Sequence, residues 1–367
     1  MRVPFLDLKR EYKQIKKEVL KKFLTVLDKG EYCYGEETEK FEKSFAKLTG
    51  CRYCFGLGSG TDSLMIALKA SGIKPGDEVI TTTFSFIATV EAIINVGAYP
   101  VLIDIDQETM NFDLEKVVQK IDKKTKAIIP VHLYGVTVDM DKLLNIVRKY
   151  KLAIIQDAAH AEGSRYKGKP VSSFGDVSCF SLYPSKSLGA YGNAGAISTN
   201  KKIIAHQIRM ISNHGRDRDK NIHQVIGYTG TIDNLQSAVL NIKLKYFSQN
   251  IRRKKMIARE YNRAFANLPF KSQKIPSFCD PSFYVYTIRF DKRDKLKEFL
   301  AKNGVGTGIY YPFPLHLQPS LQFLGYKKGD FPIAEQTAAS VLSLPLYPQM
   351  TDKEVEYVIQ KVKAFFV

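Results

Sequence analysis

The sequence predicts an α/β protein, with a large domain built on a mostly parallel sheet and a smaller α+β domain after it. Short apolar, β-branched runs alternate with longer amphipathic segments, which is typical of strands that alternate with helices. Near residue 245 this alternation gives way to a Lys/Arg-rich helical pattern. The chain has 367 residues, and single cores usually divide beyond roughly 250–300 residues. We therefore expect domains at 1–245 and 246–367.

The strands and helices of the first domain follow from these runs. Strands are predicted at "EVITTTF" (78–84), "PVLIDID" (100–106), "KAIIPVHLYG" (126–135) and "LAIIQDAAH" (152–160). Helices are predicted at "DSLMIALKASG" (62–72) and "MDKLLNIVRKY" (140–150). Strands that alternate with helices favour a parallel sheet covered on both faces.

The second domain mixes both element types. It opens with a basic helix, "NIRRKKMIAREYNRAFANL", continues through the strand "SFYVYTIRF" and the helix "DKLKEFLAKNG", and closes with another helix. No internal repeat is visible along the chain.

Composition and charge limit the classes of function. The chain is 44% hydrophobic and carries a net charge of +18, which raises the possibility of nucleic-acid binding. Its lysines are spread along the sequence without a nucleic-acid motif, so a solvated basic surface or attraction of a small anionic substrate is favoured. The N-terminal stretch lacks a signal-peptide core, and no apolar run reaches the roughly 18–20 residues of a membrane span. We expect a cytoplasmic protein without a membrane or nucleic-acid partner.

Five cysteines, an odd number, fit a reducing compartment better than a disulfide framework. Cys51 and Cys54 spell C-x-x-C, but no second Cys or His pair at close spacing completes a zinc site. Structural thiols are therefore favoured over a metal or redox site.

The glycine-rich stretch "GLGSGTDSL" (56–64) lies between a strand and a helix. Such a turn presents backbone N–H groups and a helix N-terminus to an anion, and the Thr61 hydroxyl adds a donor. A dinucleotide fingerprint would need glycine at position 61, and no acidic residue ends the next strand, so a Rossmann dehydrogenase is disfavoured. The alternative is a tight turn that binds nothing.

Asp157 stands at the carboxyl end of the apolar run "LAIIQ". Open α/β sheets bind ligands at this edge, and a carboxylate there is costly to desolvate unless a cation meets it. Taken alone, Asp157 is equally well explained as a helix N-cap.

Lys186 is the only charged residue between Asp176 and Lys201, within the polar, glycine-rich stretch "SLYPSKSLGAYGNAGAI". A solvated lysine is almost wholly protonated at neutral pH, since its pKa is about 10.4. A nucleophilic lysine must lose that proton or be held as a Schiff base, and uncharged surroundings suit this role. An ordinary surface lysine is the alternative.

An anion-binding turn, a strand-end carboxylate and an isolated lysine together match pyridoxal phosphate (PLP), which has a phosphate, a pyridinium nitrogen and an aldehyde. The sequence also resembles the nucleotide-sugar aminotransferases of the DegT family, essentially from end to end. The resemblance is carried by "PFLDLKREY", "GSGTDSL", "PGDEVITTTFSFIATVEAI", "KAIIPVHLYG", "IIQDAAHAEGSRYKGKPVSSFGDVSCFSLYPSKSLGAYGNAGAI", "IDNLQSAVL", "YYPFPLHLQP" and "SLPLYPQMT". It implies the type I PLP-transferase fold and a homodimer with shared active sites.

The resemblance also implies roles for single residues. Lys186 would hold the cofactor and move protons on the substrate, and Asp157 would pair with the ring nitrogen. His160 would lie beside the phenolic oxygen and Phe86 would stack on the ring. The phosphate would be held by Gly60, Thr61 and Ser181. The family often has an asparagine, reaching across the dimer, where this chain has Thr229, and an acidic residue where it has Asn193.

The predicted function is a transaminase that moves an amino group from glutamate, through the pyridoxamine form (PMP), to a keto sugar on a nucleotide diphosphate (UDP or dTDP). "PSKSLGAYGNAGA" resembles the subgroup that aminates carbon 3, whereas carbon-4 enzymes usually have histidine before the proline and "G-E-G-G" after the lysine. Two alternatives on the same fold stay open: a PLP-dependent sugar dehydratase, which carries histidine in place of Lys186, and a non-catalytic regulatory protein.

Overall fold

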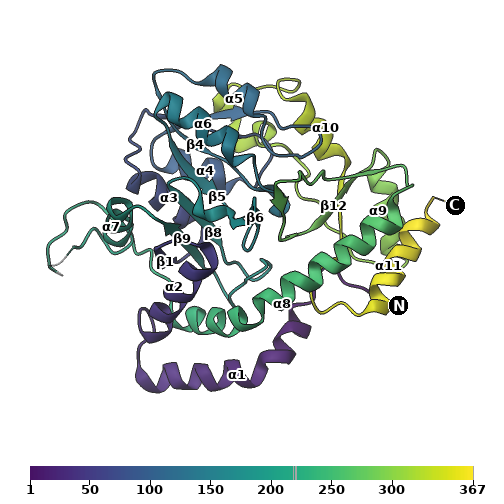
Figure 1. Ribbon diagram of the computed structural model, residues 1–367, viewed down its shortest axis with the longest axis horizontal. Coiled ribbons are helices and arrows are strands. Elements are labelled where there is room, and N and C mark those ends of the chain that lie inside the picture. Colours follow the sequence, from purple (N-terminus) through teal and green to yellow (C-terminus); the bar gives the residue numbers. More distant parts are fainter. Residues whose placement is uncertain (218, 220, 367) are drawn as a thin grey trace.

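The computed structural model describes residues 1–217, 219 and 221–366. Within these residues, the larger sheet has seven strands in the order β1-β9-β8-β5-β4-β2-β3 (Figure 1). Its strands are β1 (Tyr53–Leu57), β2 (Glu78–Thr82), β3 (Tyr99–Ile103), β4 (Thr125–Ile129), β5 (Ala153–Asp157), β8 (Val177–Ser181) and β9 (Gly195–Thr199). Strands β8, β5, β4, β2 and β3 run parallel, and β9 is antiparallel to both of its neighbours. The predicted α/β fold with a mostly parallel sheet is confirmed.

Helices cover both faces of this sheet. Alternate strand residues point to opposite faces, so Ile128 and Ile154 join one hydrophobic core while Ile129 and Ile155 join the other. The core with Ile129 is covered by α3 (Gly60–Ala70), α4 (Ala88–Asn95) and α7 (Lys202–Ile211). The core with Ile128 is covered by α2 (Glu36–Thr49), α5 (Leu114–Lys120), α6 (Met140–Tyr150) and the first half of α8 (Asn234–Phe265).

The four predicted strands all form, but each ends earlier than its apolar run. In β4 the chain leaves the sheet at Pro130, which cannot donate a backbone hydrogen bond, and residues 133–135 make a tight turn. In β5 it leaves after Asp157. The remaining residues of these runs form loops at the carboxyl edge of the sheet, where a ligand site is expected.

The C-terminal part is a smaller α+β unit. Its antiparallel sheet joins β10 (Lys271–Ser272), β12 (Tyr286–Arg289) and β13 (Val341–Leu344). The helices beside it are α9 (Arg293–Lys302), α10 (Pro332–Ser340) and α11 (Asp352–Ala364). A second small sheet pairs β11 (Cys279–Asp280) with β6 (Arg165–Tyr166), which also pairs with β7 (Lys169–Pro170), so it links the two parts of the chain.

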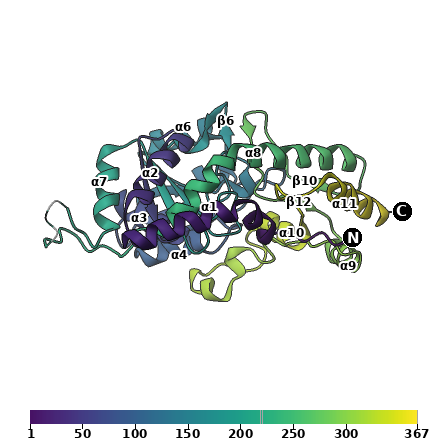
Figure 2. The same cartoon turned by 90° about the horizontal axis from the view of Figure 1, so that it is seen from below.

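The long helix α8 connects the two cores. Leu240 and Phe247 pack in the core of the larger sheet, whereas Ile257 and Tyr261 pack in the C-terminal core. Figures 1 and 2 show α8 running from the larger sheet toward the C-terminal helices, with α1 (Leu8–Lys29) near its first half. Any movement of the C-terminal part relative to the sheet must therefore involve this helix.

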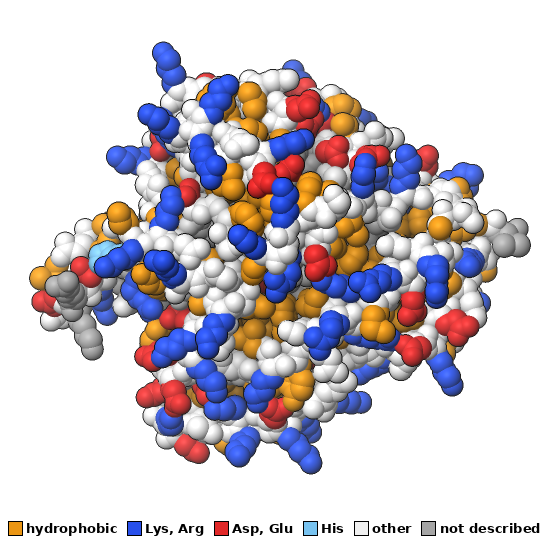
Figure 3. Space-filling view, in the orientation of Figure 1, with side chains coloured by type: hydrophobic (Ala, Val, Ile, Leu, Met, Phe, Trp, Pro, Cys, Tyr) orange, Lys and Arg blue, Asp and Glu red, His pale blue; other side chains and the backbone are white. Residues whose placement is uncertain are grey.

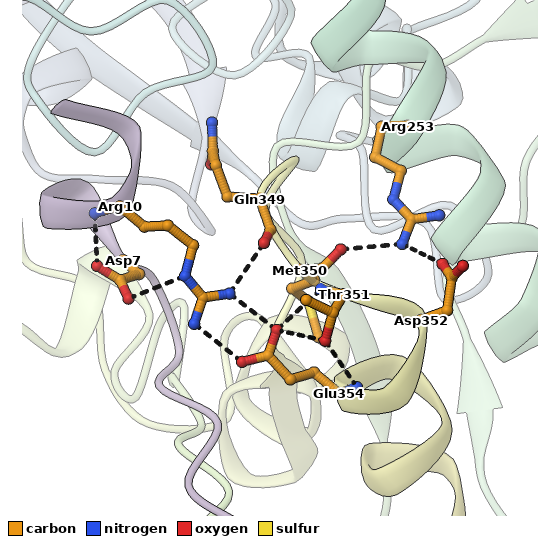
Figure 4. Close-up of polar contacts among 8 residues, drawn as sticks. All are labelled: Asp7, Arg10, Arg253, Gln349, Met350, Thr351, Asp352 and Glu354. Atoms are coloured by element: carbon orange, nitrogen blue, oxygen red, sulfur yellow. Dashed lines mark hydrogen bonds and ion pairs between the residues drawn. The ribbon is translucent and has the colours of Figure 1, made fainter. Parts of the chain in front are cut away.

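The beginning and the end of the described chain are joined by a polar cluster (Figure 4). The Arg10 guanidinium donates to both carboxylate oxygens of Glu354, at 2.8 and 3.0 Å, and to the Gln349 carbonyl at 2.9 Å. Glu354 also closes a capping box with Thr351 at the start of α11. The cluster thus fixes α1 and α11 together.

The molecular surface carries Lys and Arg side chains scattered over the face seen in Figure 3, interspersed with acidic ones. Of the described helices, none is long and apolar enough to cross a membrane. Cys51 and Cys54 are buried, and burial raises the pKa of both thiols. Within the described residues no group of His, Cys, Asp and Glu side chains could hold a metal ion.

We predict that Glu354→Gln lowers the free energy of unfolding by about 1 kcal/mol near neutral pH, because Arg10 and the cap lose their charged partner. The hydrogen bond from Arg10 holds the pKa of Glu354 below its ordinary value of 4.5. The stabilisation by the ionised Glu354 carboxylate is therefore fully present above pH 4.5. It is lost as the pH falls through the lower pKa that Glu354 has in the folded protein. Urea unfolding at about pH 7 and about pH 3 measures both effects.

The control is Glu356→Gln, an exposed carboxyl on the same helix. It should leave the stability unchanged at both pH values. A loss in Glu354→Gln that is equally large in acid would contradict a charge-based role.

Candidate active site

A cavity of about 510 Å³ opens at the carboxyl edge of the larger sheet. Its floor is formed where β5 ends at Asp157, β8 ends at Ser181 and α3 begins at Gly60. Seven of the eight predicted site residues line it: Gly60, Thr61, Phe86, Asp157, His160, Ser181 and Lys186. Thr229 is not among the lining residues.

The Asp157 carboxylate is buried, with 6% of the residue exposed. Thr89 Oγ1 donates to its Oδ2 at 2.7 Å, and the Ala159 N–H donates to its Oδ1 at 3.1 Å. Burial raises the pKa of Asp157, while these two hydrogen bonds oppose the rise. The group is thus held in one orientation and would be stabilised by a cation in the cavity.

Lys186 lies on a tight turn that follows β8. Its N–H donates to the Tyr183 carbonyl at 2.8 Å, and the chain folds back so closely that a Cβ on Gly189 would lie 2.5 Å from the Pro184 carbonyl oxygen. Lys186 Nζ stands 4.6 Å from the centre of the Tyr284 ring. Burial lowers the pKa of Lys186, which raises the fraction of free amine available for reaction.

The first turn of α3 faces the cavity with N–H groups that no helical carbonyl can satisfy. Ser59 caps the helix by accepting from the Asp62 N–H at 3.0 Å. A Cβ on Gly60 would lie 2.8 Å from the Ser181 Cβ, so glycine lets Ser181 approach the helix start. The partial positive charge of the helix N-terminus and the nearby hydroxyls suit a phosphate.

The His160 imidazole is neutral and can donate a hydrogen bond from Nε2. The Tyr134 N–H points at its Nδ1, at 3.4 Å, which assigns the proton to Nε2. Burial first, and then the positive charges of Lys186 and Lys254, keep the pKa of His160 well below its usual range. The imidazole also stacks on Tyr284 at 4.2 Å between ring centres.

Sequence reasoning missed several lining residues. The C-terminal part contributes the three tyrosines Tyr284, Tyr310 and Tyr311, although the last two lie in the quoted motif "YYPFPLHLQP". Phe86, 56% exposed, stands 6.1 Å from the Tyr311 ring and is not an ordinary core aromatic. The sequence also did not identify Thr89 as the hydrogen-bond partner of Asp157, because no local pattern distinguishes a threonine that contacts a distant carboxylate.

Thr229 does not line the cavity of its own chain. It is exposed, its hydroxyl is 3.1 Å from His214 Nε2, and its backbone pairs with Asn213. It belongs to the segment after α7, at the point where this segment returns to the sheet, because the next residue, Gly230, accepts a hydrogen bond from the Gly58 N–H. Figures 1 and 2 show the segment extending away from the body of the molecule. Asn193, by contrast, lines the cavity.

The lining residues fit PLP. A desolvated amine, a buried carboxylate that needs a cation, and a helix N-terminus with hydroxyl donors surround one cavity, and each matches a different end of that molecule. These features at the carboxyl edge of a mostly parallel sheet define an enzyme of the type I PLP-transferase fold.

The sequence match over residues 13–363 completes the assignment: the chain belongs to the DegT/DnrJ/EryC1/StrS aminotransferase family. A pleiotropic regulatory protein of Geobacillus stearothermophilus is 40% identical, with 100% of this chain and 99% of the relative covered. The dTDP-3-amino-3,4,6-trideoxy-alpha-D-glucose transaminase of Streptomyces venezuelae is 37% identical, with 99% and 96% covered. The UDP-2-acetamido-2-deoxy-3-oxo-D-glucuronate aminotransferase of Pseudomonas aeruginosa is 37% identical, with 97% and 98% covered.

Solved structures agree with this assignment. The structure of S. venezuelae DesV in complex with a ketimine intermediate superposes with a TM-score of 0.97, at 37% identity, covering 99% of this chain and 98% of that one. The structure of NtdA from Bacillus subtilis, with the cofactor PMP bound, gives a TM-score of 0.91 at 31% identity, covering 99% and 85%. The predicted family and fold are confirmed.

We predict that Asp157→Asn slows the glutamate half-reaction about 100-fold or more, because in the predicted role of Asp157 the ring nitrogen would lose the negative charge that favours its protonated form. Cofactor should still bind, since Lys186 and the start of α3 are unchanged. Stopped-flow absorption after mixing with glutamate measures the rate.

Asp176→Asn is the matched control, because this carboxylate accepts a hydrogen bond from Ile154 at the opposite edge of the same two strands. It should react at the wild-type rate. Should Asp157→Asn also keep that rate, Asp157 is only a structural cap.

Proposed function

We propose that this enzyme transfers the amino group of glutamate to carbon 3 of a keto sugar linked to a nucleotide diphosphate. The observation that carries the proposal is the arrangement of Lys186 and Asp157 on one cavity with the N-terminus of α3. The P. aeruginosa and S. venezuelae relatives act on UDP- and dTDP-linked 3-amino or 3-oxo sugars, as their names state.

We assign one task to each group around the cofactor. When bound, PLP supplies an aldehyde that takes up the amino group and a ring that accepts electrons. Lys186 Nζ would hold it covalently and, as a free amine, take up and return a proton. Asp157 would keep the ring nitrogen protonated, and His160 Nε2–H would donate to the phenolic oxygen.

The remaining predicted residues would bind and position. The N–H groups of Gly60 and Thr61, with the Ser181 hydroxyl, would hold the phosphate. Phe86 would cover the ring from the side of the cavity that also carries Tyr311.

Two alternatives on the same fold are less well supported. A dehydratase of this fold would carry histidine at the position of Lys186. A regulatory role is suggested by the name of the G. stearothermophilus relative, but a protein without catalysis has no need of a desolvated lysine facing a buried carboxylate. Retention of both groups favours the enzyme.

Product analysis tests the proposal. The purified protein, given glutamate and a UDP- or dTDP-linked 3-keto sugar, should form a 3-amino sugar and 2-oxoglutarate, as seen by NMR. Nitrogen at carbon 4 would show that the position on the sugar is wrong. Loss of the hydroxyl group without transfer of nitrogen would instead identify a dehydratase.

We also propose a homodimer in which residues 213–231 of one subunit complete the site of the other, with Thr229 near the cofactor phosphate. The described part of this segment projects from the body and exposes apolar side chains, with Ile222 at 51% and Ile226 at 86% exposure. Exposed apolar residues on a projecting loop are typical of an interface.

We predict a dimer in sedimentation equilibrium and recovery of activity when two inactive variants are mixed. One is Lys186→Ala, and the other replaces residues 221–226 with glycine and serine. In a hybrid dimer that contains one subunit of each variant, one site carries both defects and the other site is intact. A fully active monomer, or no recovery after subunit exchange, would rule out the shared site.

The division into domains at 1–245 and 246–367 is likewise a proposal, supported by the change of core along α8. Val3 lies in the C-terminal core and pairs with Val305, so the first residues cross over to the second domain. We propose a cytoplasmic enzyme of amino-sugar biosynthesis for a surface polysaccharide or a glycosylated metabolite, and its five free thiols suit a reducing compartment.

A further inference from the structure

Lys254 is a buried lysine that the proposed function does not use. It lies on α8, and only 4% of the residue is exposed. Among the described residues its Nζ donates to two neutral acceptors, Ser187 Oγ at 3.1 Å and the Tyr284 carbonyl at 3.2 Å, and pairs with no carboxylate. Lys243, the other buried lysine of α8, differs because it pairs with Glu11 at 2.6 Å. The charge of Lys254 is therefore left without a direct counter-charge.

A small second cavity, which we call the rear cavity, is lined by both Lys186 and Lys254. Its volume is about 50 Å³, and its walls come from the start of α1, the turn at residues 183–187, α8, Tyr284 and residues 346–349. Lys186 and Tyr284 also line the larger cavity of about 510 Å³, whereas Lys254 does not. The turn and Tyr284 thus separate the cofactor site from Lys254.

Two hydrogen bonds fix the position of Lys254 relative to Lys186. Ser187 directly follows Lys186 in the chain, so its bond to Lys254 Nζ attaches the ammonium to the turn itself. The Tyr284 ring centre lies 4.6 Å from Lys186 Nζ, while the carbonyl of the same residue accepts from Lys254 Nζ. The two amines are therefore neighbours that share a cavity lining and both contact Tyr284.

The carboxylates that line the rear cavity are engaged with other cations. Asp7 accepts from the Arg10 N–H at 2.9 Å, and its other oxygen lies 3.5 Å from Arg10 Nε. Glu11 pairs with Lys243. Neither carboxylate is thus available to neutralise Lys254.

The titratable groups on the other side of Lys186 are also engaged or neutral. Asp157 accepts hydrogen bonds from Thr89 and Ala159, and His160 is neutral. Glu162, in the turn after β5, has no hydrogen-bond partner among the described residues, and burial raises its pKa to about 8, so it is mostly neutral near pH 7. Burial also raises the pKa of four tyrosine hydroxyls that line the two cavities, so they stay protonated: Tyr284, Tyr310, Tyr311 and Tyr347.

Two positive charges in one buried region repel each other, so a neighbouring cation favours the neutral form of an amine. Lysine nucleophiles are activated in this way. Burial lowers the pKa of both lysines, and that of Lys254 falls to about 8, so Lys254 is still mostly an ammonium at pH 7. The two hydrogen bonds from Lys254 Nζ favour its charged form, so Lys186 is the amine that loses its proton first.

We propose that Lys254 is a positioning residue for Lys186: its positive charge favours the free amine of Lys186, and its two hydrogen bonds hold the turn and Tyr284 around that amine. Lys254 does not line the cofactor cavity and acts through Lys186. The free amine is the form of lysine that reacts with an aldehyde or takes up a proton. The inference rests on the proposed role of Lys186 as the reacting lysine.

The test is competitive labelling of Lys186 with acetic anhydride in the full-length, cofactor-free protein, followed across pH by peptide mass spectrometry. The labelling midpoint is the pH at which half of Lys186 is a free amine. Lys254→Gln removes the charge but keeps a side-chain N–H donor, and it should raise this midpoint by about one pH unit. At a pH below both midpoints, labelling should be about tenfold slower. Lys254→Arg keeps the charge and should keep the wild-type midpoint.

The matched control is Lys255→Met, which removes the next lysine of α8, paired with Asp280 at 2.6 Å outside both cavities. It should leave the midpoint of Lys186 unchanged. An unchanged or lower midpoint in folded Lys254→Gln overturns the proposal. An equal rise in Lys254→Arg would assign the effect to the shape of the side chain, and this also overturns it.

A reciprocal measurement decides the question if Lys254→Gln does not fold. Coupling between two charged groups acts equally in both directions, so Lys186→Met should raise the labelling midpoint of Lys254 by a similar amount. No change in that midpoint overturns the proposal.

Failure of the proposed function would be seen elsewhere. Wild-type protein that takes up no PLP at Lys186, by borohydride reduction and mass spectrometry, would refute the role of Lys186 in holding the cofactor. The labelling midpoints are measured without cofactor and still report whether Lys254 controls the protonation of Lys186.

Discussion

The carboxylate of Asp157 lies out of water at the end of β5, held by the Thr89 hydroxyl and the Ala159 N–H. A negative charge in that position requires a compensating positive charge in the cavity, and the surrounding architecture sets where it can come from. Asp157 pairs in register with Cys179 on β8, and β8 leads within a few residues to Lys186. The register of two parallel strands therefore sets the spacing between carboxylate and amine.

The cavity is closed by residues from both parts of the chain. The larger sheet supplies the charged groups, while the C-terminal part supplies Tyr284, Tyr310 and Tyr311. α8 spans both cores, and its Lys254 contacts the Tyr284 carbonyl. Because a rigid helix joins the two parts, the distance between the tyrosines and Lys186 depends on how α8 packs.

The main strands and the central pair of site residues could be predicted because their signals are local. An apolar run reports a buried strand, and Lys186 stands out because its neighbours are uncharged. Thr89 and Tyr284 could not be found in this way, since their importance arises from contacts with segments far away in sequence. Thr229 lies outside the cavity of its own chain, so sequence and single-chain geometry alone leave its role as a prediction.

The cluster between Arg10 and Glu354 has a consequence for the order of events during synthesis. The two residues are 344 positions apart, and ribosomes add about 5–20 residues per second, so Arg10 waits roughly 17–70 s for its partner. Once β9 has been made, the whole larger sheet, Asp157 and Lys186 exist, whereas Tyr310 and Tyr311 are added more than 100 residues later. During synthesis, the nascent chain thus has a cavity that lacks its C-terminal tyrosines and the contact between Arg10 and Glu354. At this stage the chain is more accessible to ligands, proteases and a second copy than the finished protein is.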